Sequence, residues 1–180
     1  MICVVIFGQK PDRAARLAAG TLSRFGAVQL HTSEGFELLG NGLPFCTVEA
    51  VCRLERLLIP GAILVLSDQT TPRRLEMSED VIVIAGTDNR RMRRLLEGHL
   101  NPVVTCGTGS RDTLTVSSIT PERAVLCAQR ELPTVFGTWL EPMEFAAQLR
   151  GCSLAFALPV AGIAAVCGCV LSDRDMIIGL

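Results

Sequence analysis

Residues 2–7 read Ile-Cys-Val-Val-Ile-Phe, and Gly8 follows them directly. A continuous apolar run of this length is typical of a parallel strand that is covered on both faces. Pro11 and Asp12 then give the signals that begin a helix, and Gly26 gives the signal that ends it. The apolar residues between these signals recur at helical spacing: Ala14, Leu17, Ala18, Leu22 and Phe25. The chain therefore opens with a predicted strand, turn and helix.

Strand and helix patterns alternate over the first hundred residues. Short apolar runs predict further strands at residues 28–30, 62–66, 81–85 and 103–106. One helix is expected over the apolar positions within residues 48–58, and another after Asp88, which can cap it. Residues 33–44 contain several glycines and are expected to form a loop. Repeated strand–helix units predict a doubly wound, mostly parallel sheet.

The pattern changes after Asn101. Short strands are expected around residues 114–116 and 124–128, with turns at Pro133 and Gly137. Their close spacing predicts a small antiparallel β ribbon, and an apolar helix follows it near the C-terminus. The predicted fold is α/β: a mostly parallel doubly wound sheet with an antiparallel ribbon and a C-terminal apolar helix. No linker or repeat divides the sequence, so residues 1–180 are expected to form a single domain.

Composition excludes several classes of protein. The chain is 49% hydrophobic and 19% charged, which excludes disorder, and its formal net charge of -1 gives no reason to expect nucleic-acid binding. Eight cysteines are present, but only Cys167 and Cys169 are closely spaced, and no histidine lies near them. That pattern does not predict a zinc site. Free thiols in a reducing cytoplasm are the expected state, and the N-terminus shows no basic segment typical of a signal peptide.

The twenty residues from Cys152 to Leu171 contain no charged side chain. About 20 apolar residues suffice to cross a bilayer, so a membrane-anchoring helix is one interpretation. A helix buried on all sides within a globular core gives the same pattern. Alanine, glycine and proline within the segment favour the buried helix.

The order of these elements resembles the central domain of the Mur ligases, the ATP-dependent amino-acid ligases of peptidoglycan synthesis, and of their folylpolyglutamate synthase relatives. Residues 7–14, Phe-Gly-Gln-Lys-Pro-Asp-Arg-Ala, occupy the place of the family's phosphate loop, Gly-Thr-Asn-Gly-Lys-Thr-Thr. Residues 83–89 resemble its Val-Val-Asn-Ala-Asp-Asp-Pro strand end, and residues 103–107 its Val-Ile-Thr-Phe-Gly strand. Residues 149–151, Leu-Arg-Gly, resemble the family's approach to its last central helix.

The resemblance implies ATP and magnesium as cofactors, but the site residues depart from the family's pattern. Pro11-Asp12-Arg13 replaces the second glycine and the Lys-Thr pair that hold phosphate and magnesium. The strand at 62–66 lacks the family's glutamate, and Asp68 beyond it is expected to be a loop residue. The family's adenine-contacting asparagine corresponds to Ala85. We therefore predict no catalytic residues and no metal site.

A degenerate anion or nucleotide site remains open at Gly8, Lys10, Arg13 and Asp88. Three hypotheses follow. The leading one is a non-catalytic Mur-ligase-like domain that acts as a binding or regulatory module, either as a homo-oligomer or with another protein. The alternative is a nucleotide-binding protein or ATP-dependent enzyme with a degenerate phosphate loop. The second alternative is a small protein anchored in a membrane by residues 152–171.

Overall fold

The computed structural model of the chain describes residues 1–67, 72, 74–87, 90–170 and 175–179. The first strand, β1 (Ile2–Phe7), pairs in parallel with β4 (Pro44–Val51) on one side and with β6 (Ile63–Leu66) on the other. Its side chains point alternately into two hydrophobic cores, one on each face of the sheet. This burial on both faces explains why the run of apolar residues is unbroken.

The parallel part of the sheet extends on both sides of β1. Beyond β6 it continues through β8 (Ile82–Gly86) and β9 (Val103–Cys106), while β2 (Ala27–Thr32) pairs in parallel with β4. Helix α1 (Asp12–Leu22) connects β1 to β2 and packs on one face of these strands. The first predicted helix and the strands predicted in this part are confirmed, with small shifts in their bounds.

Two predictions between β2 and β6 are wrong. The helix predicted over residues 48–58 is replaced by β4 and the short strand β5 (Arg56–Leu57). Cys46 and Val48 of β4 are both fully buried on one face, which is the period of two that a strand requires. The loop predicted over residues 33–44 contains β3 (Gly35–Leu39), which pairs antiparallel with β2. Most of its side chains are exposed, so its sequence carries little of the hydrophobic signal of a strand.

The C-terminal half extends the same sheet. After β9, strand β10 (Leu114–Ile119) pairs antiparallel with β11 (Arg123–Ala128), and β11 pairs antiparallel with β14 (Met143–Arg150). Strand β15 (Met176–Gly179) then pairs in parallel with β14. Among the described residues, the sheet has 11 strands in the order β15-β14-β11-β10-β9-β8-β6-β1-β4-β2-β3. The mostly parallel α/β sheet and its antiparallel ribbon are confirmed, whereas β14 and β15 were not predicted.

Two further pairs of short strands lie outside the large sheet. Strand β5 pairs with β7 (Glu76–Met77), and β12 (Leu132–Pro133) pairs with β13 (Trp139–Leu140). The β12–β13 hairpin contacts the C-terminal end of the apolar helix, because the Val135 N–H donates to the Val166 carbonyl at 3.0 Å. The turns predicted at Pro133 and Gly137 therefore belong to this hairpin.

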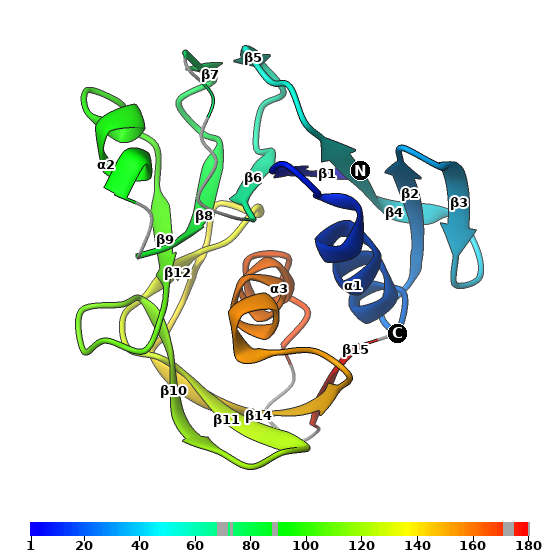
Figure 1. Ribbon diagram of the computed structural model, residues 1–180, viewed down its shortest axis with the longest axis vertical. Coiled ribbons are helices and arrows are strands. Elements are labelled where there is room, and N and C mark those ends of the chain that lie inside the picture. Colours follow the sequence, from blue (N-terminus) through cyan, green and yellow to red (C-terminus); the bar gives the residue numbers. More distant parts are fainter. Residues whose placement is uncertain (68–71, 73, 88–89, 171–174, 180) are drawn as a thin grey trace.

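The predicted C-terminal apolar helix is α3 (Leu154–Val166), and the sheet curves around it (Figure 1). Strands β8, β9, β10 and β15 contact it, and α1 lies beside it on the concave side of the sheet. Gly162 faces these strands: a Cβ atom there would be in ordinary van der Waals contact with Ile84 Cγ2 at 3.4 Å and Cys106 Sγ at 3.6 Å. Protein atoms therefore cover the helix from Val160 to Val166, where every residue is buried, whereas Ala155 in its first turn is exposed.

The length of α3 bears on the interpretation of residues 152–171 as a membrane span. The helix has 13 residues and is about 20 Å long at 1.5 Å per residue, whereas a bilayer core is about 30 Å thick. In the described part of the chain, no helix is both long enough and apolar enough to cross a membrane.

The second core lies on the opposite, convex face of the sheet. It joins the outward side chains of β1, β6 and β8 with residues of the segments that follow β4 and β6. Helix α2 (Arg90–Leu96) covers part of this face through Leu95 and Leu96. With α1 and α3 on one face and α2 on the other, the sheet has helices on both sides, as predicted for a doubly wound fold.

Substitution of a fully enclosed side chain of α3 should destabilise the protein strongly. Ile163 is 1% exposed, and its replacement by alanine leaves a cavity that the surrounding strands cannot close. We expect Ile163→Ala to lower the free energy of unfolding by about 2–4 kcal/mol in urea denaturation. Ile119→Ala removes the same atoms from a side chain that is 54% exposed, and should cost less than about 1 kcal/mol. If the two variants lost the same free energy of unfolding, the burial of Ile163 in α3 would be contradicted.

Candidate functional site

The candidate site lies where β1 ends and α1 begins. The Gly8 N–H donates to the Val51 carbonyl at 3.2 Å, so this amide already has a partner in β4. The Phe7 carbonyl accepts two hydrogen bonds from Ser67, one from its N–H at 2.9 Å and one from its hydroxyl at 3.0 Å. Of the backbone N–H groups in this turn, that of Gly8 is thus bonded within the protein at the end of β1.

An acidic side chain occupies the N-terminal end of α1. Pro11 precedes the helix, has no N–H of its own, and accepts the Ala15 N–H through its carbonyl at 2.9 Å. Asp12 is the first helical residue, and its carboxylate accepts hydrogen bonds from the N–H and the hydroxyl of Ser33 in the β2–β3 turn. A negative charge at this position interacts favourably with the helix dipole. Asp12 therefore places a negative charge in the first turn of α1, with its carboxylate bonded to Ser33.

The two basic residues predicted for the site, Lys10 and Arg13, have different surroundings. The Arg13 guanidinium carbon lies 5.0 Å from the centre of the Phe156 ring, at the start of α3. Lys10 is exposed. Of the other acidic candidates, Asp88 and Asp68 lie outside the described residues. The structure therefore brings Gly8 and Arg13 to the end of β1. It adds Phe156, Ser33 and Ser67, which no sequence pattern indicated.

A narrow apolar pocket opens beside this turn, between the N-terminal ends of α1 and α3. Its lining comes from β1, β6, both helices and the residue after β6: Ile6, Ala14, Val65, Ser67, Ala155, Phe156, Pro159, Val160 and Ile163. Ser67 is the single polar side chain of this lining, and its hydroxyl is already bonded to the Phe7 carbonyl. The pocket therefore offers an apolar surface at the carboxyl ends of β1 and β6, where ligands of open α/β sheets commonly bind.

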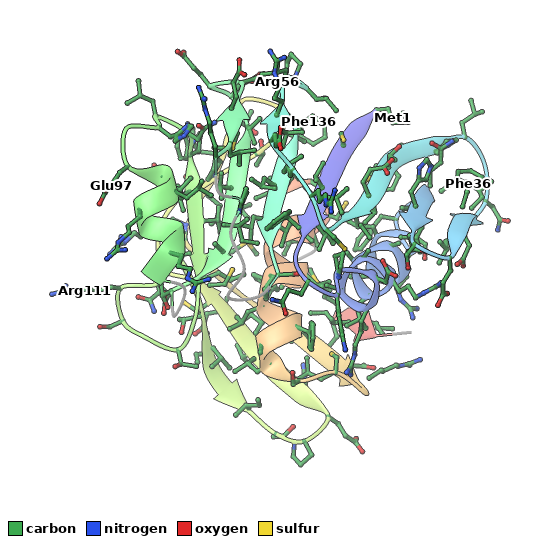
Figure 2. All side chains as sticks on the ribbon, turned by 45° about the horizontal axis from the view of Figure 1, so that its top comes forward. Met1, Phe36, Arg56, Glu97, Arg111 and Phe136 are labelled. Carbon is green, nitrogen blue, oxygen red and sulfur yellow. The ribbon has the colours of Figure 1, made fainter. Side chains whose placement is uncertain are left out.

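The loop between β9 and β10 is built around a buried carboxylate. Asp112 is 2% exposed; its Oδ2 accepts the Gly109 N–H at 2.8 Å, and its Oδ1 has no hydrogen-bond partner among the described residues. A Cβ atom at Gly107 would lie 2.4 Å from Asp112 Oδ2, so only glycine fits there. Arg111 projects away from the body of the molecule (Figure 2). This arrangement closes a loop and does not gather cationic groups around an anion site.

The cysteines are free thiols, and several are buried. Burial raises the pKa of Cys46 to about 12 and that of Cys169 to about 11, because a thiolate loses its hydration in the core. The pKa values of Cys106 and Cys167 are raised for the same reason. Cys106 is therefore a protonated core residue and not a reactive thiol. Over the described residues, His, Cys, Asp and Glu form no group of three or more that could hold a metal ion.

The sheet order defines the class of the protein: an α/β protein with a mostly parallel sheet and a small antiparallel ribbon. No protein-family model and no curated protein sequence matches the chain.

Solved structures of Mur ligases are similar to it in fold. One is a murein peptide ligase from Psychrobacter arcticus, with a TM-score of 0.58 at 9% identity over 95% of this chain and 44% of that protein. Another is UDP-N-acetylmuramoylalanyl-D-glutamyl-2,6-diaminopimelate–D-alanyl-D-alanyl ligase from Acinetobacter baumannii, with a TM-score of 0.58 at 10% identity over 93% and 43%. A MurF ligase from Thermotoga maritima in complex with ADP gives 0.51 at 11% identity over 92% and 44%. The chain spans less than half of each protein.

The contact between Asp12 and Ser33 should be measurable as a coupling energy. We expect Asp12→Ala to lower the free energy of unfolding by about 1 kcal/mol, because α1 loses an anion at its N-terminus and Ser33 loses an acceptor. In a double-mutant cycle with Ser33→Ala, urea denaturation should give a coupling of about 0.5–1 kcal/mol. Asp80→Ala, an exposed acidic residue in a turn, serves as the control and should change stability by less than about 0.5 kcal/mol. If the free-energy changes of the two single variants added up to that of the double variant, the two side chains would not interact.

The buried thiols predict a loss of stability at alkaline pH. Their folded-state pKa values exceed the unfolded value of about 8.5, so stability is complete below that pH and is lost as pH rises towards 11–12. Each such thiol contributes a slope of up to about 1.4 kcal/mol per pH unit. The chain has no tyrosine and Lys10 is its sole lysine, so few other side chains titrate between pH 9 and 11. Cys46→Ala should reduce the slope measured by urea denaturation, whereas Cys52→Ala, at an exposed site, should leave it unchanged.

Proposed function

We propose that this protein is a non-catalytic Mur-ligase-like binding or regulatory module, in which the nucleotide-clamping function of the β1–α1 turn has been lost. The observation that carries the proposal is the carboxylate of Asp12 at the N-terminal end of α1, bonded to Ser33. A triphosphate bound there would meet this negative charge at close range and would have to displace an existing contact. Repulsion replaces the attraction that a helix N-terminus normally offers to phosphate.

Other groups that a nucleotide site needs are missing or already engaged in contacts, and this supports the same proposal. Phosphate loops surround their ligand with backbone N–H groups, but here Pro11 has none and the Gly8 N–H is bonded to Val51. The guanidinium carbon of Arg13, the first basic residue of the helix, lies over the Phe156 ring at 5.0 Å from its centre. The four residues of β6 are Ile-Leu-Val-Leu, which offer no carboxylate to magnesium. Acyl-phosphate chemistry needs a clamped triphosphate and a metal, so we infer that ligase chemistry is absent.

A binding role is compatible with the exposed surface. Large apolar side chains are exposed at two places. Phe36 on the edge strand β3 is 60% exposed, and Trp139 on the β12–β13 hairpin is 61% exposed. Aromatic side chains of this kind are enriched at protein interfaces. We propose contact with a second copy of the chain or with another protein, in the cytoplasm, where the free cysteines remain reduced.

Thermal unfolding of the pure protein with Mg-ATP, Mg-ADP and UDP-linked sugars tests this function. A ligand that binds only the folded state adds about 2.7 kcal/mol of stability at one hundred times its dissociation constant. We expect no shift of the melting temperature with any of these ligands at millimolar concentration. A magnesium-dependent shift with ATP, abolished in Lys10→Gln or Arg13→Gln, would instead establish the alternative, a nucleotide site that uses a degenerate phosphate loop.

A further inference from the structure

Strand β3 forms one edge of the large sheet, at the opposite end from β15 (Figure 1). It pairs with β2 on one side, and no described strand pairs with its other side. The residues of a strand direct their N–H and C=O groups alternately to the two sides, so part of the β3 backbone has no partner strand. Among the described residues, 35–39 form no backbone hydrogen bond outside the pair with β2. The outer side of β3 therefore presents free donors and acceptors to another extended segment.

The other edge of the sheet is covered. Met176 and Ile178 of β15 are buried, and α1 packs against this strand. Soluble proteins usually protect an edge strand by such cover, or by free charges, proline or a bulge. Strand β3 contains no proline, and no register shift interrupts its pairing with β2. Within the described residues, the large sheet therefore has one open edge, at β3.

The charges near β3 are already paired. Glu37 is the single ionisable residue of the strand, and its carboxylate lies 2.6 Å from the Arg16 guanidinium. Arg16 also pairs with Glu34 in the turn before the strand. Glu37 lies opposite Leu30, which is buried in the same core as α1, so these ion pairs lie on the face of the sheet that α1 covers. A charged partner segment would find no unpaired counter-charge at this edge.

The opposite face of β3 is apolar and exposed. Side chains alternate along a strand, so Phe36 and Leu38 lie on the face away from Glu37, where they are 60% and 53% exposed. Figure 2 shows Phe36 at the periphery of the molecule. A matching partner strand has apolar side chains on one face and no unpaired charge. The sequence of β3 itself, Gly-Phe-Glu-Leu-Leu, meets both requirements.

We propose that the β3 edges of two copies of this chain pair antiparallel across a two-fold axis and form a homodimer with one continuous sheet. An axis perpendicular to the sheet keeps both apolar faces on the same side, so Phe36 and Leu38 of one copy lie next to those of its partner. A register centred on Glu37 would place two carboxylates opposite each other, which is unfavourable, whereas registers centred on Phe36 or Leu38 avoid this. Because each copy has one open edge, association stops at the dimer. The inference rests on the proposed function, because it names the partner of the binding module.

Sedimentation velocity of the full chain without nucleotide, from micromolar to millimolar concentration, measures the association. Specific complexes usually bury roughly 800 Å² on each partner, and the five residues of β3 offer less, so we expect a reversible dimer with a micromolar dissociation constant. Hydrogen exchange at low and high protein concentration locates the contact, and amides within residues 36–39 should exchange more slowly in the dimer. A chain that stays monomeric up to millimolar concentration, or that forms larger polymers, would overturn the proposal.

Matched lysine variants test the surface. Leu38→Lys brings like charges together at the two-fold axis and should weaken the dimer by about tenfold or more. Ile119→Lys changes a side chain of equal exposure on β10, 54% against 53%, and should leave the dissociation constant unchanged. Trp139→Lys on the β12–β13 hairpin should also have no effect. If circular dichroism shows that Leu38→Lys does not fold, Phe36→Lys replaces it.

Two results would assign the dimer to another surface and refute the β3 contact. One is a dimer that Ile119→Lys or Trp139→Lys weakens as much as Leu38→Lys does. The other is a concentration-dependent slowing of exchange that leaves out residues 36–39.

These measurements, combined with the nucleotide titrations, separate this proposal from the proposed function. A monomer that does not bind Mg-ATP refutes the β3 contact and leaves the loss of the nucleotide site standing. A dimer through β3 that binds Mg-ATP supports the β3 contact and refutes the loss of the nucleotide site. A monomer that binds Mg-ATP refutes both.

Discussion

The enclosure of α3 by the curved sheet is the constraint on which the rest of the structure depends. A helix without a polar face is stabilised by burial on every side, and each residue of α3 from Val160 to Val166 is buried. Strands β8, β9 and β10 cover one side, β15 and α1 cover others, and the β12–β13 hairpin contacts its end. Alanine and glycine on α3 let these elements approach closely. Both the parallel strands and the C-terminal strands of the sheet thereby pack against α3.

The same enclosure determines the chemistry at the end of β1. Because α3 starts beside α1, it places Phe156 under the guanidinium of Arg13 and lines the adjacent pocket with apolar side chains. On the other side of the helix end, the β2–β3 turn places Ser33 against Asp12. The end of β1 is therefore lined by apolar side chains where α3 lies and carries the Asp12 carboxylate where α1 begins.

Sequence patterns predicted elements well where a strand or helix is buried uniformly. The central strands β1, β6 and β8 are apolar without interruption because cores lie on both of their faces, and the helical spacing of α1 reflects its single buried face. The patterns failed in β3 and β4. Most side chains of β3 are exposed at the edge of the sheet, and β4 mixes buried and half-buried positions whose spacing resembled a helix. In both strands, the neighbours that decide the pattern are distant in sequence.

The amino-acid sequence by itself determined the α/β class, the central parallel strands and the buried apolar helix. Each of these depends on local order: periodicity, glycine and proline signals, and which residues stand next to one another. Only the tertiary structure decided that the sheet curves around α3, that Ser33 bonds Asp12, and that the Arg13 guanidinium lies over the Phe156 ring. These contacts join segments far apart in the chain, and no local pattern encodes which surfaces meet when the apolar faces are buried together.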